Sequence, residues 1–113
     1  MGSDYERELK SILIQKDWLI TRSAGSMGIA DLIALKPNEH LIIEVKSTKA
    51  NKFYTTTTKE SKEQFISLNE YAKQGFNVYY YVRWKGYGKN KWEYWKLPLT
   101  PYPIFRKHEG TKL

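Results

Sequence analysis

The sequence predicts an α/β fold in which helices flank a central mixed β-sheet. Two segments carry apolar residues at the spacing of one helical face, and several short runs are rich in apolar, β-branched and aromatic residues. Their order along the chain is helix, strand, hairpin, helix, strand, strand, which is typical of a layered α/β domain. A chain of 113 residues can bury one hydrophobic core but not two, so we expect a single domain over residues 1–113.

The first predicted helix covers residues 4–16, with Ser3 as its expected N-cap. The apolar side chains that share one face of this helix are Tyr5, Leu9, Ile12 and Leu13. Residues 18–22 predict an extended segment, and the small, glycine-bearing residues 23–28 predict a flexible loop.

Residues 29–46 predict a β-hairpin with both strands largely buried. The apolar runs at 29–35 and 40–46 are separated by Pro37 and Asn38, which favour a turn. Residues 47–60 are polar, threonine-rich and basic, so we expect a loop or lid there that is mobile without a ligand.

The second predicted helix begins at Ser61, which has capping-box spacing to Gln64, and ends at Gly75. The apolar side chains on its buried face are Phe65, Leu68 and Ala72. Aromatic and β-branched residues then predict strands at 76–84 and 91–97, joined as a hairpin, and the proline-containing tail after residue 98 is expected to be irregular.

The composition argues against several classes of protein. The chain has no cysteine, which excludes disulfides and thiolate metal sites, and the distance in sequence between His40 and His108 argues against a zinc site. It has no apolar run of the roughly 18 residues that a membrane helix needs, and its N-terminus lacks a signal-peptide pattern. We therefore expect no membrane association and a cytoplasmic, intracellular location.

The net charge of +7 is distributed unevenly. Residues 1–46 hold six Lys and Arg against seven Asp and Glu, a net charge of −1, whereas residues 47–113 hold thirteen against five, a net charge of +8. A basic half of this kind favours a polyanion as the partner, and nucleic acid is the commonest polyanion. A solubilising surface is the alternative interpretation.

Asp31, Glu44 and Lys46 are the ionisable residues of the two apolar runs at 29–35 and 40–46, apart from His40. A buried carboxylate without a partner is costly, so such a residue persists where a cation or a reaction uses it. A hairpin can bring Asp31 alongside Glu44, and alternation places Lys46 on the same face. Two converging carboxylates suit Mg²⁺, and the lysine could orient water or stabilise phosphate charge. An ion pair at a sheet edge is the alternative.

Three further positions have both a functional and a structural interpretation. Glu6 lies on the helix face expected to pack on the sheet, but it also has the spacing of a capping box and of an ion pair with Lys10. Arg7 could contact phosphate or be solvated. Ser23 and Ser26 could cradle a phosphate or only permit a turn, and their loop lacks the Gly-Lys-Ser/Thr end of a Walker loop, so no nucleotide cofactor is expected.

The segments YEREL, TRSAGS…ADLIAL and LIIEVKS together resemble the archaeal-type Holliday junction resolvases of archaea and some viruses, a family of the PD-(D/E)xK nuclease superfamily. Their order and spacing match over about residues 4–48, and beyond that only the order of helix and strand is similar. The resemblance implies a restriction-endonuclease-like core. Ala30 stands where the superfamily motif usually has proline.

By this resemblance, Asp31 and Glu44 are metal ligands together with the Val45 carbonyl, and Lys46 is the catalytic lysine. Glu6 matches a further active-site acid and a possible metal ligand. The residues matched to the active-site rim and loop, where DNA is engaged, are Arg7, Arg22 and Ser26, with Ser26 counted among the catalytic residues. The other expected DNA contacts are Ser23, Lys49, Lys52, Lys59 and Lys62.

The resemblance implies a homodimer that cuts opposite strands of a four-way DNA junction symmetrically, with Mg²⁺ as cofactor and Mn²⁺ as a substitute. A two-fold axis would match the near two-fold symmetry of the junction, and recognition would depend on junction shape and phosphates. Two alternatives stay open: another PD-(D/E)xK endonuclease or nickase, and a catalytically silent DNA-binding module on the same fold.

Overall fold

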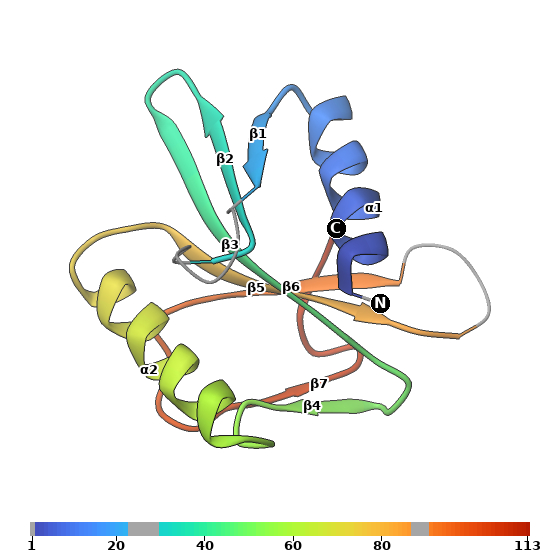
Figure 1. Cartoon of the computed structure of the whole chain (residues 1–113), viewed down its shortest axis with the longest axis vertical. Coiled ribbons are helices and arrows are strands. Elements are labelled where there is room, and N and C mark those ends of the chain that lie inside the picture. The colour runs from blue at the N-terminus through green and yellow to red at the C-terminus, as the bar shows by residue number, and fades with distance from the viewer. Residues whose placement is uncertain (1, 23–29, 87–90) are drawn as a thin grey trace.

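The computed structural model describes residues 2–22, 30–86 and 91–113, and its secondary structure follows the predicted α/β order with additional short strands (Figure 1). The elements in chain order are α1 (Gly2–Gln15), β1 (Leu19–Arg22), β2 (Leu32–Lys36), β3 (Glu39–Thr48), β4 (Lys52–Tyr54), α2 (Lys59–Lys73), β5 (Val78–Trp84), β6 (Trp92–Lys96), β7 (Ile104–Arg106) and β8 (Thr111–Lys112).

Six of the strands form a mixed sheet in the order β1-β2-β3-β5-β6-β8, and β4 and β7 form a separate two-stranded sheet. The pair β3–β5 is parallel, and the other neighbouring pairs are antiparallel. Parallel strands need a long crossover connection, and α2 lies in the connection between β3 and β5. The prediction of a central mixed sheet flanked by helices is therefore confirmed.

The two helices cover opposite faces of the large sheet, as the alternation of residues along β3 shows. Ile43 packs with Leu9 and Leu13 of α1 in one core cluster. Ile42 packs with Phe65 and other residues of α2 in a second cluster. Successive side chains of a strand point to opposite faces, so Glu44 and Lys46 share the face of Ile42, which is the face that α2 covers.

In the described residues of the N-terminal half, the elements follow the prediction except at the start of α1. This helix begins at Gly2, so Ser3 lies inside it and the predicted N-cap is wrong. The hairpin of β2 and β3 has the predicted turn, in which Asn38 adopts a positive φ of 65°. An asparagine tolerates this left-handed conformation better than most residues do.

Two segments expected to be irregular form strands. The predicted loop at 47–60 is wrong for residues 52–54, because β4 pairs with β7 from the tail after residue 98, where a further strand, β8, also forms. The predicted start of the second helix is also wrong, since Thr58 is the N-cap and its side-chain oxygen accepts a hydrogen bond from the Ser61 amide at 3.0 Å.

The other helix and strand predictions for the second half are confirmed, and the expected mobility of residues 47–60 stays a prediction. The side chains expected on the buried face of α2 are buried, and Gly75 follows the helix with a φ of 108°. The strands β5 and β6 pair in antiparallel orientation. The predicted loop at 23–28 lies outside the described residues, and the single domain stays a prediction. None of the helices in the described ranges is long and apolar enough to cross a membrane.

Candidate active site

The structure brings Asp31 and Glu44 together on neighbouring strands. Asp31 directly precedes β2, and the register pairs Leu32 with Ile43, so the next pair in this register is Asp31 with Glu44. The Val45 amide donates a hydrogen bond of 2.8 Å to Oδ2 of Asp31, which fixes this carboxylate against β3. Backbone pairing and this hydrogen bond therefore determine the position of both acids.

Glu44 is buried, with an exposed fraction of 3%, and its two oxygens have different environments. Oε2 lies 3.1 Å from Nζ of Lys46. Oε1 is buried and has no hydrogen-bond partner among the described residues. Burial, followed by the nearby charge of Asp31, raises the pKa of Glu44 to about 7, although Lys46 acts in the opposite direction.

The charge of Asp31 acts on groups from three elements. It contributes, after burial, to the raised pKa values of Glu6 on α1, of Glu44 on β3 and of Tyr80, which is paired with Glu44 on β5. Glu44 contributes to the raised pKa of Tyr80 as well. The negative charges therefore concentrate at one point of the sheet, next to Asp31.

Glu6 reaches this cluster from α1 and pairs with Arg22 of β1, whose Nη2 lies 3.5 Å from Oε1 of Glu6. Burial and then Asp31 raise the pKa of Glu6, while Arg22 lowers it. The capping-box interpretation of Glu6 is wrong because Ser3 is inside the helix. An ion pair of Glu6 with Lys10 is not formed in the described structure, where Arg22 takes this place.

Lys46 lies on β3, which is flanked by β2 and β5, so its ion pair with Glu44 is not at a sheet edge as the alternative interpretation supposed. Its ammonium also donates a hydrogen bond of 2.9 Å to Oε1 of Gln64 from α2. In the sequence, Gln64 was predicted only as part of a capping box. Its position four residues before Leu68, on the buried face of the helix, is the signal that could have found it.

The carboxylates do not form a complete metal cage by themselves. Across residues 2–22, 30–86 and 91–113, no three Asp, Glu or His side chains lie close enough to enclose a metal ion. Mg²⁺ in proteins commonly binds one or two carboxylates and keeps water or phosphate oxygens as its other ligands. The pair Asp31 and Glu44 could hold such an ion, and the buried Oε1 of Glu44 without a partner fits this use.

The candidate DNA contacts are distributed over the surface. Arg7 is exposed and lies 3.8 Å from Asp4, and Lys59 is 3.9 Å from Glu63 on the same helix. Ser23 and Ser26 lie outside the described residues.

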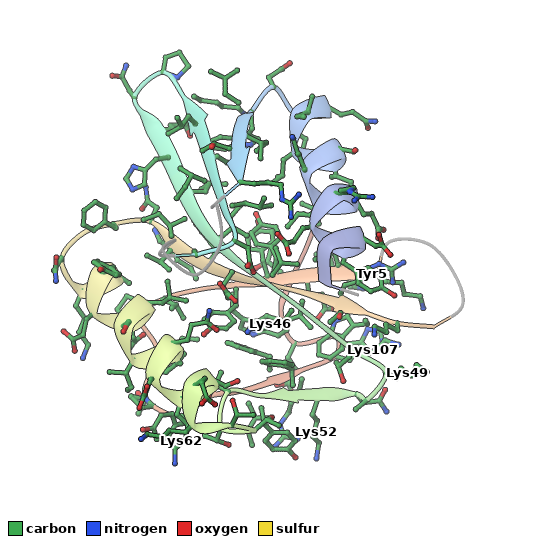
Figure 2. The ribbon with its side chains drawn as sticks, in the orientation of Figure 1. Tyr5, Lys46, Lys49, Lys52, Lys62 and Lys107 are labelled. Atoms are coloured by element: carbon green, nitrogen blue, oxygen red, sulfur yellow. The ribbon has the colours of Figure 1, made fainter. Side chains whose placement is uncertain are left out.

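Figure 2 places four lysines along the side of the molecule formed by β4, β7 and the start of α2: Lys49, Lys52, Lys62 and Lys107. Lys107 was not among the predicted DNA contacts, because it lies in the tail that was expected to be irregular.

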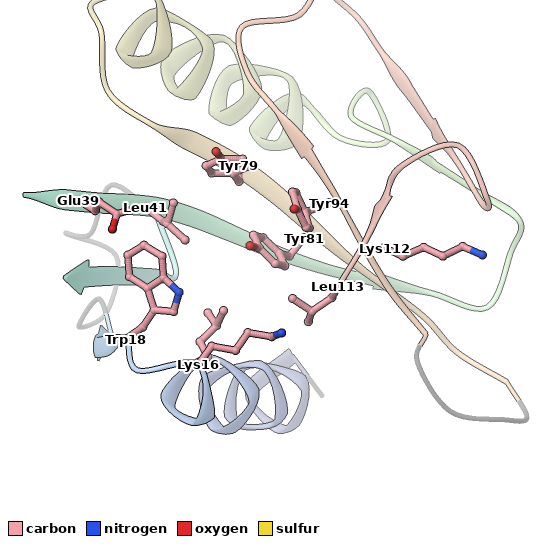
Figure 3. Close-up of a pocket in the computed structure, with 10 residues that line it drawn as sticks. Lys16, Trp18, Glu39, Leu41, Tyr79, Tyr81, Tyr94, Lys112 and Leu113 are labelled. Carbon is pink, nitrogen blue, oxygen red and sulfur yellow. The ribbon is translucent and has the colours of Figure 1, made fainter.

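A hollow of ≈ 360 Å³ lies on the other face of the sheet (Figure 3). Its lining includes Leu13 of α1, Leu41 of β3 and Tyr81 of β5, which belong to the core cluster on the α1 side or pack against it. The lining contains none of the carboxylates that converge near Asp31. The hollow is therefore separate from the candidate active site.

The mixed sheet with one helix on each face, and the acid pair at the hairpin of β2 and β3, define an α/β protein with an acidic site on one face of its sheet. A family model described as archaeal Holliday junction resolvase (Hjc) matches residues 1–100. The chain therefore belongs to the archaeal Holliday junction resolvase family.

Two known proteins are similar to this chain. The crossover junction endodeoxyribonuclease Hjc of Methanocaldococcus jannaschii is 46% identical over 69 residues, which cover 61% of this chain and 50% of that protein. The chain thus matches about half the length of this curated relative. The solved structure of the Holliday junction resolvase Hjc from Archaeoglobus fulgidus aligns with a TM-score of 0.68 and 22% identity, covering 99% of this chain and 91% of the other. This second likeness shows the fold.

Proposed function

We propose that this chain is a metal-dependent endonuclease that resolves four-way DNA junctions. The observation that carries this proposal is the convergence of Asp31 with Glu44, whose Oε1 is buried without a hydrogen-bond partner in the described structure. An uncompensated buried carboxylate oxygen costs free energy, and a cation bound during function would offset this cost. Membership in the resolvase family and the names of the relatives support the junction as the substrate.

Asp31 and Glu44 would hold the divalent cation, Mg²⁺ or its substitute Mn²⁺, with the Val45 carbonyl and Glu6 as further candidate ligands. When bound, such a cation supplies a Lewis acid that favours ionisation of a water molecule and polarises the phosphate. The Val45 amide holds Asp31 in place. The ammonium of Lys46, 3.1 Å from Glu44, would stabilise the negative charge that develops on the phosphate when water attacks it.

The lysines on the side of β4, β7 and α2 would contact the phosphates of the junction arms. Lys49, Lys52 and Lys62 are exposed, and Lys107 is half-buried beside them (Figure 2). Contacts of this kind fix the position of the duplex without reading its sequence, so affinity should fall steeply with salt. This expectation agrees with recognition by the shape of the junction.

Two symmetric cuts require two active sites, so we propose that the protein acts as a homodimer. Leu19 and Leu35 form a cross-strand pair on β1 and β2 and are exposed to 73% and 43%. Exposed apolar surface of this kind suits a contact between two identical copies. Sedimentation analysis should find a dimer for the wild type and a monomer for Leu35→Glu; a wild-type monomer would contradict this part of the proposal.

The direct test is cleavage of a labelled mobile junction with Mg²⁺, with EDTA and with the Asp31→Asn variant. We expect paired nicks with Mg²⁺ only, and intact junction binding by the variant. Plain duplex and flap substrates serve as controls, because equal cutting of duplex would instead indicate a general endonuclease or nickase. Salt-sensitive junction binding without hydrolysis under any divalent ion would indicate a DNA-binding module without catalysis.

A further inference from the structure

We propose that Gln64 is a positioning residue that holds the ammonium of Lys46 in place when Glu44 is engaged with a cation. The inference rests on the proposed function, because it concerns the same phosphodiester hydrolysis. It adds a residue from α2 to a site whose other members lie on α1, β1, β3 and the segment before β2.

The ammonium of Lys46 has two partners from different elements, Glu44 in an ion pair and Gln64 in a hydrogen bond. Oε2 of Glu44, two residues earlier on β3, lies 3.1 Å from its Nζ, and Oε1 of Gln64 on α2 lies 2.9 Å from the same atom. A lysine side chain has four rotatable bonds, so one contact leaves much of its freedom, whereas two contacts from separate elements define the position of its ammonium.

The ion pair between Lys46 and Glu44 becomes weaker when Glu44 binds the cation that the proposed reaction uses. A cation on Glu44 competes with Lys46 for the negative charge of one carboxylate, and it also repels the ammonium. Gln64 belongs to another element, α2, and its amide carbonyl keeps its acceptor strength when the cation binds. The hydrogen bond to Gln64 is therefore the contact that persists in the reactive state.

Gln64 is held rigidly enough for this role. Phe65 and Leu68, which follow Gln64 by one and four residues on α2, are fully buried in the core cluster on this face of the sheet. The start of the helix is capped by Thr58. Farther along α2, Asn69 exchanges two hydrogen bonds of 2.9 Å with the backbone of Leu99. These contacts fix α2 against the sheet and the tail, so the amide of Gln64 has a defined position.

A neutral acceptor also suits the electrostatics of the site. Asp31 and Glu44 are opposite each other in the hairpin register, and Glu6 pairs with Arg22 of β1, so the site already holds several carboxylates. A glutamine supplies a carbonyl oxygen without adding a further negative charge. It can therefore fix Lys46 without competing with Glu44 for the cation.

The first experiment compares Gln64→Met with Gln74→Met in single-turnover cleavage of the junction at saturating protein. The control variant removes the same type of side chain from an exposed position at the end of the same helix. We expect Gln64→Met to lower the cleavage rate about 10- to 100-fold, as small misplacements of reacting groups do. Junction affinity should change by less than about twofold, because the loss is confined to the transition state.

A second experiment measures the order of the Lys46 ammonium directly by ¹⁵N relaxation of its side chain in the presence of Mg²⁺. A lower order parameter in Gln64→Met, but not in Gln74→Met, would support the proposal. If Gln64→Met does not fold, Gln64→Ala serves in its place, because alanine also removes the acceptor and favours the helix.

The two proposals can fail separately. A wild-type protein that binds the junction but does not cut it with any divalent ion contradicts the proposed function, whatever Lys46 does. A wild-type protein that cuts, together with an unchanged rate in Gln64→Met, overturns the role of Gln64 alone. An unchanged order parameter of Lys46 in Gln64→Met overturns it as well.

Discussion

Two glutamates are buried in this sheet, and their surroundings differ. Glu44 on β3 and Glu93 on β6 have exposed fractions of 3% and 4%. The carboxylate of Glu93 accepts hydrogen bonds from the backbone amides of His108, at 3.0 Å to each oxygen, and of Gly110, at 3.2 Å. One carboxylate oxygen of Glu44 forms an ion pair with Lys46, and the other oxygen has no hydrogen-bond partner in the described part of the chain.

This comparison separates a structural carboxylate from one available for chemistry. Backbone amides that converge on Glu93 compensate its burial and tie the tail of the chain to β6. The buried oxygen of Glu44 lacks such compensation. Burial, followed by the charge of the neighbouring Asp31, raises the pKa of the Glu44 carboxyl. The same degree of burial therefore indicates a structural role for Glu93 and a chemical role for Glu44. The difference lies in how many oxygens of each carboxylate have a hydrogen-bond or ion-pair partner.

The largest expected effect is on cleavage by Glu44→Gln. If Glu44 holds the cation, its loss should lower the single-turnover rate by at least about 10²- to 10³-fold, the range found when one electrostatic contact to a transition state is removed. Glu93→Gln is the matched control and should retain the rate, measured at a temperature at which it is folded. Similar losses in both variants would contradict the distinction between the two glutamates.

The second prediction concerns stability. Glu93→Ala should lower the free energy of unfolding by about 2–3 kcal/mol, because buried backbone amides near His108 and Gly110 lose a charged acceptor. Urea unfolding monitored by tryptophan fluorescence measures this change. Hydrogen exchange should become faster at residues 108–110. A change under about 0.5 kcal/mol, as for an ordinary surface substitution, would show that Glu93 is not a structural anchor.

The third prediction is that Glu44→Gln stabilises the metal-free protein. A carboxyl whose pKa is about 7 in the folded protein, against an ordinary value of 4.5, binds its proton more tightly when the protein is folded. Its contribution to stability is full below pH 4.5 and is lost as the pH rises through 7. At pH 8 with EDTA, the variant should therefore be more stable than the wild type by about 2 kcal/mol.

Equilibrium unfolding of both proteins at pH 5 and pH 8 measures this difference, which should shrink at the lower pH. Glu93→Gln should show no such gain at pH 8, since its carboxylate is compensated by backbone amides. A wild type that is more stable than Glu44→Gln at pH 8 without metal would contradict the interpretation.

Much of the site's geometry followed from local patterns in the sequence. Pro37 and Asn38 indicated the turn, the turn fixed the register of the hairpin, and the register brought Asp31 opposite Glu44. Alternation along β3 then placed Lys46 on the same face as Glu44. These steps need only neighbours in sequence, which is why they were predictable.

The parts that were missed depend on distant partners. β4 gains its strand structure from β7, where Lys52 pairs with Arg106. Glu93 is compensated by backbone amides, which every residue except proline has and which therefore leave no mark in the sequence. Gln64 meets Lys46 only because α2 packs over β3, and the periodicity of α2 does not specify where along the sheet it lies.

The smallest expected effect is the stabilisation of the folded protein by Mg²⁺. Ligand binding to the folded state alone adds RT ln(1 + [L]/Kd) to the free energy of unfolding, about 1.4 kcal/mol when the concentration is ten times Kd. Thermal unfolding with increasing Mg²⁺ should raise the Tm of the wild type and of Glu93→Gln, but not of Glu44→Gln. A shift that persists in Glu44→Gln would place the cation elsewhere, and the oxygen of Glu44 without a partner would then need another explanation.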